Sequence, residues 1–261
     1  MIKVAAVQLA LCDQETRADR FLRVEQRLED FYRSGIMPDL VMLPEMWATG
    51  FINFHRYTAE SEPLQGETFT RLAPWAEKLG CYFLAGSFVE RDGQDYFNTS
   101  LLLGPDGSLA GSYRKVHLFG YQSRESEILT PGSEIVVVPA SFGKIGLSTC
   151  YDLRFPELYR KLMEAGAEIL LVPAAWPMAR LEHWVLFNRA RALENLCYLV
   201  SCNCSGSLGG AVLAGNSMAV NPWGEVVARS GESEAILTVE LDPAKVPETR
   251  RRFPVLEDRR I

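Results

Sequence analysis

The sequence lacks the features that would place a protein in a membrane or on nucleic acid. No apolar run reaches the roughly 18 residues that a membrane-spanning helix needs. Its 27 Lys and Arg are outnumbered by 33 Asp and Glu, and the net charge of −6 leaves no basic excess for phosphates or an anionic lipid surface. The N-terminus enters a strand pattern at once and shows no signal-peptide cleavage region. We therefore expect a cytoplasmic protein with no nucleic-acid and no membrane partner.

Cysteine and histidine are also scarce. The six cysteines should be free thiols in a reducing cytosol. Cys197, Cys202 and Cys204 lie close together, but they lack a fourth ligand and a zinc motif, so we expect no metal and no cofactor. None of the three histidines closes a predicted strand. A protease-like pair of cysteine and histidine is therefore poorly supported.

What the chain does contain is an alternation of strands and helices without any dividing linker. The predicted strands span 2–9, 39–43, 81–90, 134–138, 144–149, 168–172, 197–203 and 235–240, the helices 16–34, 68–79, 155–165 and 181–196, and the hairpins 98–115 and 217–228. Segments 117–132 and 205–210 are predicted loops, and the basic tail is expected to be exposed. The pattern indicates one α/β domain over residues 1–261. It leaves open whether the strands form one large sheet or two stacked sheets.

Cys150 stands at a predicted sharp turn between a strand and a helix. The apolar run 144–149 ends just before it, and Pro156 occupies a position where a helix tolerates proline, its first turn. Such a turn directs the thiol outward at the carboxyl end of a strand, close to backbone N–H groups. This placement is typical of a nucleophile.

Two charged residues close other predicted strands. Glu45 follows the strand 39–43, and Lys115 ends the hairpin strand 108–115. Because strand carboxyl ends face the ligand crevice of an α/β sheet, we expect both side chains to meet Cys150. The carboxylate can act as a general base, and the ammonium can lower the pKa of the thiol and bind an oxyanion.

Each of these residues also has a simpler interpretation. Cys150 alone could be a buried apolar residue, Glu45 a loop or capping residue, and Lys115 a surface residue. Arg154 could bind a substrate carboxylate, but we favour an ion pair with Asp152 or Glu157 that braces the turn. The aromatic residues near the strand ends could line a pocket or belong to the core; they are Trp47, Phe119, Tyr121 and Trp176.

Three separated segments resemble the signature blocks of the nitrilase superfamily, the carbon–nitrogen hydrolases. They are Pro44-Glu45, residues 113–119 and residues 150–157, and segments 174–177, 183–184, 189–195 and 216–217 resemble later blocks. The resemblance implies a four-layer α-β-β-α sandwich of two stacked mixed sheets. It also implies a homodimer or a higher homo-oligomer.

The same resemblance implies roles for individual residues. Glu45, Lys115 and Cys150 match the catalytic triad, and Glu125 matches a second glutamate, with Glu127 as a competitor for that role. The backbone N–H of Tyr151 would complete an oxyanion site with Lys115. We expect Tyr151, Trp176 and Phe119 to contact the substrate.

The expected activity is hydrolysis of a small carboxamide through a thioester with release of ammonia. An omega-amide of a 2-oxo dicarboxylic acid is the favoured substrate, by resemblance to bacterial omega-amidase-like members. N-carbamoyl or nitrile hydrolysis with the same triad is an alternative, although true nitrilases carry Cys-Trp-Glu in place of Cys150-Tyr151-Asp152. A non-catalytic scaffold that binds a partner through its dimer surface is a further alternative, against which the intact Glu, Lys and Cys set argues.

Overall fold

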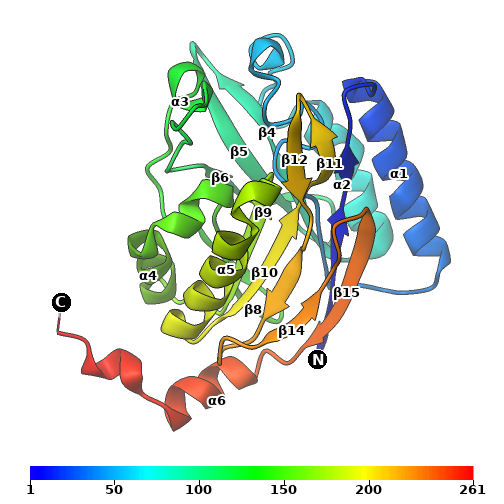
Figure 1. Cartoon of the computed structure of the whole chain (residues 1–261). Helices are drawn as coiled ribbons and strands as arrows, with labels where there is room; N and C mark the ends of the chain where they lie inside the picture. The colour runs from blue at the N-terminus through cyan, green and yellow to red at the C-terminus, as the bar shows by residue number, and fades with distance from the viewer. Residues whose placement is uncertain (261) are drawn as a thin grey trace.

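The computed structural model describes residues 1–260 and contains two six-stranded sheets stacked against each other (Figure 1). The first sheet has the order β15-β1-β3-β4-β5-β6, and the second has the order β14-β13-β10-β9-β8-β7. A small third sheet has the order β12-β11-β2. The strands therefore form two stacked sheets, which settles the question that the strand pattern alone left open.

Both large sheets are mixed. In the first sheet the parallel strands are β1 (Ile2–Gln8), β3 (Leu40–Met42) and β4 (Tyr82–Asp92), and the strands antiparallel to their neighbours are β5 (Asp95–Leu103), β6 (Leu109–Arg114) and β15 (Ala235–Leu241). In the second sheet the parallel strands are β8 (Gly143–Leu147), β9 (Ile169–Ala174) and β10 (Tyr198–Asn203), and the antiparallel strands are β7 (Val137–Ala140), β13 (Met218–Val220) and β14 (Val226–Arg229).

Helices cover the outer face of each large sheet. They are α1 (Arg17–Arg33), α2 (Glu67–Leu79), α4 (Pro156–Glu164) and α5 (Leu181–Asn195). The short α3 (Glu125–Ile128) lies at the top of the molecule in Figure 1, and α6 (Lys245–Arg252) lies at the bottom. Figure 1 shows α1 and α2 on the side of β1, and α4 and α5 on the opposite side of the molecule. The expected α-β-β-α sandwich is therefore confirmed.

The first sheet is apolar on both faces because it is covered on both. Side chains of successive strand residues point to opposite faces. On β1, Val4 and Ala6 belong to the core shared with the second sheet, whereas Ala5 and Val7 pack in the core beneath α1 and α2. This explains why β1 is a continuous apolar run rather than an alternating one.

Local sequence signals define α1. Thr16 precedes the helix, and its hydroxyl accepts from the Asp19 backbone N–H at 3.2 Å, while the Asp19 carboxylate accepts from the Thr16 N–H at 2.9 Å. This reciprocal capping box satisfies two N–H groups that a helix end leaves free. The predicted apolar stripe, which includes Phe21 and Val24, is fully buried.

The prediction of a loop at 205–210 is wrong. Residues Ser205–Leu208 form β11, which pairs antiparallel with β12 (Ala211–Ala214) and parallel with β2 (Ala10–Leu11). Gly206 has a φ of 82°, and a Cβ atom there would lie 2.4 Å from the Leu11 carbonyl oxygen. The glycine thus permits close approach between strands, whereas the sequence pattern suggested flexibility.

The prediction of an exposed basic tail is also wrong in part. Val246 and Thr249 of α6 are buried, and Arg250 donates from Nη2 to the Ala167 carbonyl oxygen at 2.9 Å. A single apolar residue among many charges was too weak a signal for this docking. Among residues 1–260, no helix is long and apolar enough to cross a membrane.

Candidate active site

Cys150 lies in a tight turn that joins β8 to α4. It adopts a φ of 46°, in the left-handed region that costs a non-glycine residue on the order of 1–3 kcal/mol. Oδ2 of Asp152 accepts from the Thr149 N–H at 2.9 Å and from the Tyr113 hydroxyl at 2.7 Å. Pro156 begins α4 as predicted. The buried Asp152 carboxylate therefore braces the turn on both sides.

Glu45 reaches the same region from the end of β3. Gly86 of β4 has a φ of 73°, and a Cβ atom there would lie 2.0 Å from the Pro44 carbonyl oxygen. Only glycine lets β4 pass this close. Met46 then donates from its N–H to the Ser87 carbonyl oxygen at 3.0 Å. These contacts fix the backbone on either side of Glu45, whose side chain is fully buried.

Lys115 joins two buried carboxylates. Its Nζ donates to Glu45 Oε1 at 2.9 Å and to both carboxylate oxygens of Glu125 at 3.0 Å. All three side chains have no exposed surface. Burial alone would lower the pKa of Lys115, but Glu125 and Glu45 raise it above the usual range of a lysine. The two carboxylates therefore favour the ammonium form of Lys115 in this cluster.

Other N–H groups complete the cluster. Asn98 of β5 donates from Nδ2 to Glu45 Oε1 at 2.8 Å and to Glu125 Oε1 at 2.9 Å. The Ala175 N–H donates to Glu45 Oε2 at 3.0 Å, and the Phe119 N–H donates to Glu125 Oε2 at 2.6 Å. Every carboxylate oxygen thus accepts at least one hydrogen bond, as buried charges require.

Cys150 lies beside Glu45 and Lys115 of this cluster, and the residue is only 7% exposed. Burial raises its pKa well above the usual range, the Glu45 carboxylate raises it further, and Lys115 opposes both by lowering it. Lys115 therefore lowers the pKa of the thiol as expected, but burial and Glu45 raise that pKa by more. These effects favour the protonated thiol, whose activation then needs a base.

The two candidate glutamates of the loop lie in different surroundings. Glu125 begins α3 and is fully buried against Lys115, whereas the side chain of Glu127 is 64% exposed and pairs with Arg124 at 3.1 Å. Burial also raises the pKa of Glu125 above that of an ordinary glutamate, with Lys115 lowering and Glu45 raising it. The structure therefore brings Glu125, and not Glu127, to the cluster.

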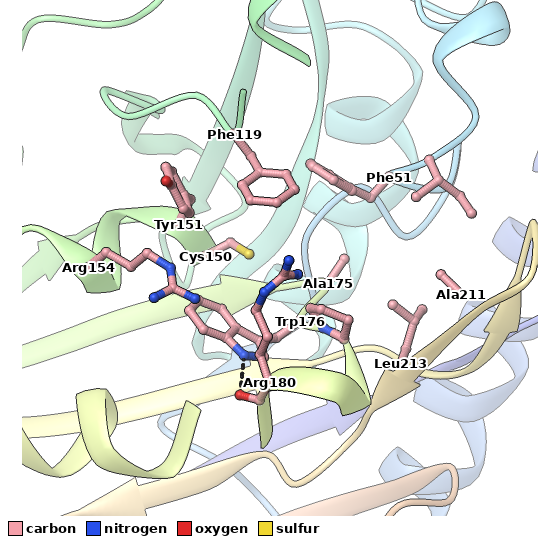
Figure 2. A pocket seen from close by; sticks show the side chains of 12 residues that line it. Phe51, Phe119, Cys150, Tyr151, Arg154, Ala175, Trp176, Arg180, Ala211 and Leu213 are labelled. Carbon is pink, nitrogen blue, oxygen red and sulfur yellow. Dashed lines mark hydrogen bonds between the residues drawn. The ribbon is translucent and has the colours of Figure 1, made fainter. Parts of the chain in front are cut away.

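A cavity of about 160 Å³ opens above Cys150. Figure 2 shows Phe51 and Phe119 on one side of the thiol and Arg154 and Arg180 on the other. The wall of the cavity contains the three residues that we expected to contact a substrate, Tyr151, Trp176 and Phe119. The cavity is small and largely apolar, with two cationic groups at its edge, which suits a small molecule that carries a negative charge.

The other two aromatic candidates do not line this cavity. Trp47 is buried, packs edge-on against Phe21 at 4.8 Å between ring centroids and donates to the Ala85 carbonyl oxygen at 2.9 Å. It is therefore a core residue. Tyr121 is 61% exposed and lies outside the cavity wall, beside the guanidinium of Arg180.

Arg154 does not brace the turn, so the favoured ion pair is wrong. Its guanidinium lies over the ring of Trp176, 5.0 Å from the centroid, and Nη2 is 3.3 Å from His183 Nδ1. The Asp152 carboxylate is already occupied by Thr149 and its other partners. Within residues 1–260, neither Arg154 nor Arg180 forms an ion pair with an acidic side chain.

The histidines occupy other positions, in agreement with their absence from the predicted strand ends. His117 Nδ1 is 2.7 Å from Asp152 Oδ1, and its ring stacks on Phe155 with centroids 3.8 Å apart. The cysteines considered as metal ligands do not converge either. Cys202 donates to the Val7 carbonyl oxygen, and Cys204 donates to that of Glu45.

Residues 3–251 of the chain match the carbon–nitrogen hydrolase family. The chain belongs to this family. A 2-oxoglutaramate amidase from Paenarthrobacter nicotinovorans is 37% identical over 268 residues, which cover 99% of this chain and 90% of that protein. Omega-amidase NIT2 from Danio rerio is 32% identical over 270 residues, which cover 99% of this chain and 94% of that protein. Nit3 of Saccharomyces cerevisiae, a member of branch 10 of the nitrilase superfamily, superimposes with a TM-score of 0.89 at 32% identity and covers 100% of this chain and 97% of its own.

Two residues of this carbon–nitrogen hydrolase were not singled out from the sequence. Asn98 is the first of three adjacent polar residues in β5, Asn98-Thr99-Ser100, and nothing in that run distinguishes it. Arg180 lies between β9 and α5 in a segment without a pattern. Its position at the cavity becomes apparent only when the turn after Trp176 is folded.

Proposed function

We propose that this carbon–nitrogen hydrolase cleaves the omega-amide of a 2-oxo dicarboxylic acid, with Cys150 as the nucleophile. One observation carries the proposal: two guanidinium groups without acidic partners in residues 1–260 lie on one side of a thiol that borders a buried Glu–Lys–Glu cluster. The cluster supplies the chemistry, and the guanidinium groups supply affinity for a carboxylate. The names of relatives such as the 2-oxoglutaramate amidase support the same substrate class.

The first half-reaction forms a thioester. Glu45 takes the thiol proton, and the electron pair left on sulfur attacks the amide carbon. The resulting oxyanion accepts hydrogen bonds from the Lys115 ammonium and the Tyr151 N–H, and Glu45 returns its proton to the departing nitrogen, which leaves as ammonia. Glu125 holds Lys115 in place, since it accepts two of the ammonium's hydrogen bonds.

The second half-reaction is hydrolysis of that thioester. Glu45 removes a proton from water, the hydroxide attacks the acyl carbon, and the same two donors bind the second oxyanion. Collapse of this intermediate releases the dicarboxylic acid and restores the thiol, which takes back the proton. Proton transfers therefore balance over the cycle without a cofactor.

The substrate assignment rests on the two arginines. Arg154 and Arg180 lie on the same side of Cys150 (Figure 2), and aromatic rings hold both guanidinium groups in position. Desolvation lowers the pKa of Arg154, and the neighbouring charge of Arg180 contributes to the decrease. A substrate carboxylate placed between them would relieve that repulsion. Neutral amides, N-carbamoyl compounds and nitriles without a carboxylate offer no such gain.

The test is ammonia release from a panel of pure compounds. It compares 2-oxoglutaramate with a neutral amide of similar length, an N-carbamoyl amine without a carboxylate and an aliphatic nitrile. We expect the anionic 2-oxo amide to have a kcat/KM at least about tenfold above the others, in line with one charge-assisted contact, and Cys150→Ala to release no ammonia. Turnover of nitriles alone, or normal turnover by Cys150→Ala, would refute the proposal, and the latter would favour a non-catalytic scaffold with a contaminating activity.

We also propose that residues 1–261 act as one domain in a cytoplasmic homodimer or larger homo-oligomer. The family match over residues 3–251 supports one domain, and six free cysteines are in keeping with a reducing compartment. Exposed apolar side chains support self-association, since Leu186 and Leu193 of α5 are 62% and 46% exposed. Light scattering at micromolar concentration tests the oligomer, and a monomer would contradict it.

A further inference from the structure

Asn98 has a placement that the proposed triad does not explain. Its side chain is fully buried, and a single nitrogen, Nδ2, donates to Oε1 of Glu45 at 2.8 Å and to Oε1 of Glu125 at 2.9 Å. The reverse orientation of the amide would direct its oxygen at two carboxylate oxygens, so chemistry determines the orientation. Among residues 1–260, Oδ1 has no hydrogen-bond partner. The unpaired oxygen is a cost that the two bonds to carboxylates offset.

These bonds make the two oxygens of Glu45 unequal. Oε1 accepts from Asn98 and from the Lys115 ammonium at 2.9 Å, so two N–H groups already point at it. Oε2 accepts only from the Ala175 N–H at 3.0 Å. Glu45 and the Ala175 N–H also act on the Cys150 thiol, since the carboxylate raises the pKa of the thiol and the N–H lowers it. A proton on Oε1 would compete with two N–H donors, those of Asn98 and Lys115. A proton on Oε2 would compete only with the Ala175 N–H.

We propose that Asn98 is a positioning residue that directs the thiol proton to Oε2 of Glu45 and keeps Glu45 and Glu125 apart around Lys115. During the transfer the S–H bond breaks, an O–H bond forms at Oε2, and the electron pair stays on sulfur. The inference rests on the proposed role of Glu45 as general base and does not depend on the substrate. Asn98 itself touches no reacting atom.

The test measures the pH dependence of Cys150 alkylation by iodoacetamide, with peptide mapping by mass spectrometry to separate Cys150 from the other cysteines. We expect Asn98→Ser to move the acid limb of the alkylation rate to higher pH by about one unit, because a carboxylate that loses a donor binds its proton more tightly. The kcat for the amide that the panel identifies should fall about 10- to 100-fold with little change in KM. Asn98→Ala should behave in the same way and serves where the serine variant does not fold.

Thr99→Val is the matched control. Thr99 is the next residue of the same strand, is equally buried and donates from Oγ1 to another buried carboxylate, Glu90 Oε2, at 2.6 Å. It should lower the melting temperature but leave the acid limb of Cys150 alkylation where the wild type has it. A folded Asn98 variant with an unshifted limb, or an equal shift in Thr99→Val, would overturn the inference.

The alkylation assay also distinguishes failure of this inference from failure of the proposed function. A shifted limb without any active amide would uphold Asn98 and reject the substrate class. If no pH-dependent alkylation of Cys150 occurred in the wild type, the proposed base mechanism would fail, and the role of Asn98 would fail with it.

Discussion

Replacing Glu125 by glutamine should inactivate the enzyme, whereas the same change at Glu127 should not. Glu125 accepts four hydrogen bonds from three groups: two from Lys115 at 3.0 Å, one from Asn98 at 2.9 Å and one from the Phe119 N–H at 2.6 Å. A glutamine offers one acceptor oxygen and one NH₂ group. In either orientation the NH₂ group therefore faces the ammonium and a second N–H donor.

The size of the effect follows from these contacts. Hydrogen bonds to charged groups contribute about 1.5–3 kcal/mol each, so two opposed donors should cost about 3 kcal/mol or more after relaxation. At roughly 2–4 °C per kcal/mol for a chain of this size, the melting temperature should fall by about 6–12 °C. Lys115 would move away from the proposed oxyanion, and loss of one such donor lowers kcat by about 10²–10³.

Glu127→Gln provides the reference. Its side chain is 64% exposed and pairs with Arg124, a surface contact worth on the order of 0–1 kcal/mol. Both variants are compared by ammonia release and by thermal unfolding followed with circular dichroism. If the kcat/KM of Glu125→Gln stays within about twofold of that of Glu127→Gln, the ammonium does not depend on Glu125 and the reasoning is wrong.

Three further outcomes are expected. Arg154→Met and Arg180→Met should each raise KM about 10- to 100-fold for an anionic omega-amide but change that for a neutral amide little; equal losses on both would argue against carboxylate binding. Gly86→Ala should destabilise the fold by more than about 2 kcal/mol in urea unfolding, because its Cβ would lie 2.0 Å from a backbone carbonyl oxygen. Gly93→Ala is the control, because Gly93 has a φ of 61° but nothing lies within 4 Å of the added Cβ. That change should cost only about 1 kcal/mol. Because burial raises the pKa of Glu125, the acid limb of kcat/KM should lie above the usual range of a glutamate, with activity present above the limb and lost as pH falls through it; a limb near pH 4 would contradict this.

The positions of the main site residues could be predicted because they follow from strand ends. Glu45 and Cys150 each lie three residues after the end of a strand, β3 and β8, Lys115 directly follows β6, and the structure brings the three side chains together. The strand pattern alone could not fix the stacking of two sheets, because both arrangements bury the same residues. It could not separate Glu125 from Glu127 either, since a helix of four residues shows no periodicity.

Asn98 shows why other residues of the site could not be predicted. Residues Phe97 to Leu103 of β5 are all buried, because the first sheet has a core on each face. Alternation of polar and apolar residues, which would reveal the side of a strand that faces a site, is therefore absent. The partners of Asn98, Glu45 and Glu125, are 53 and 27 residues away along the chain. Only tertiary packing creates these contacts.

The charge state of Cys150 illustrates a different limit. The sequence correctly suggested that a lysine lies beside the thiol, and from that alone a thiolate would follow. The buried position of Cys150 reverses this expectation, because burial and the Glu45 carboxylate together raise the pKa of the thiol more than Lys115 lowers it. A buried thiol and a buried carboxylate can exchange a proton without changing the total charge of the cluster, whereas loss of that proton to water would leave one more uncompensated buried charge. Because the thiol is buried, it needs the proposed base, and the transfer keeps the positive charge of Lys115 beside the oxyanion that forms when the thiol attacks.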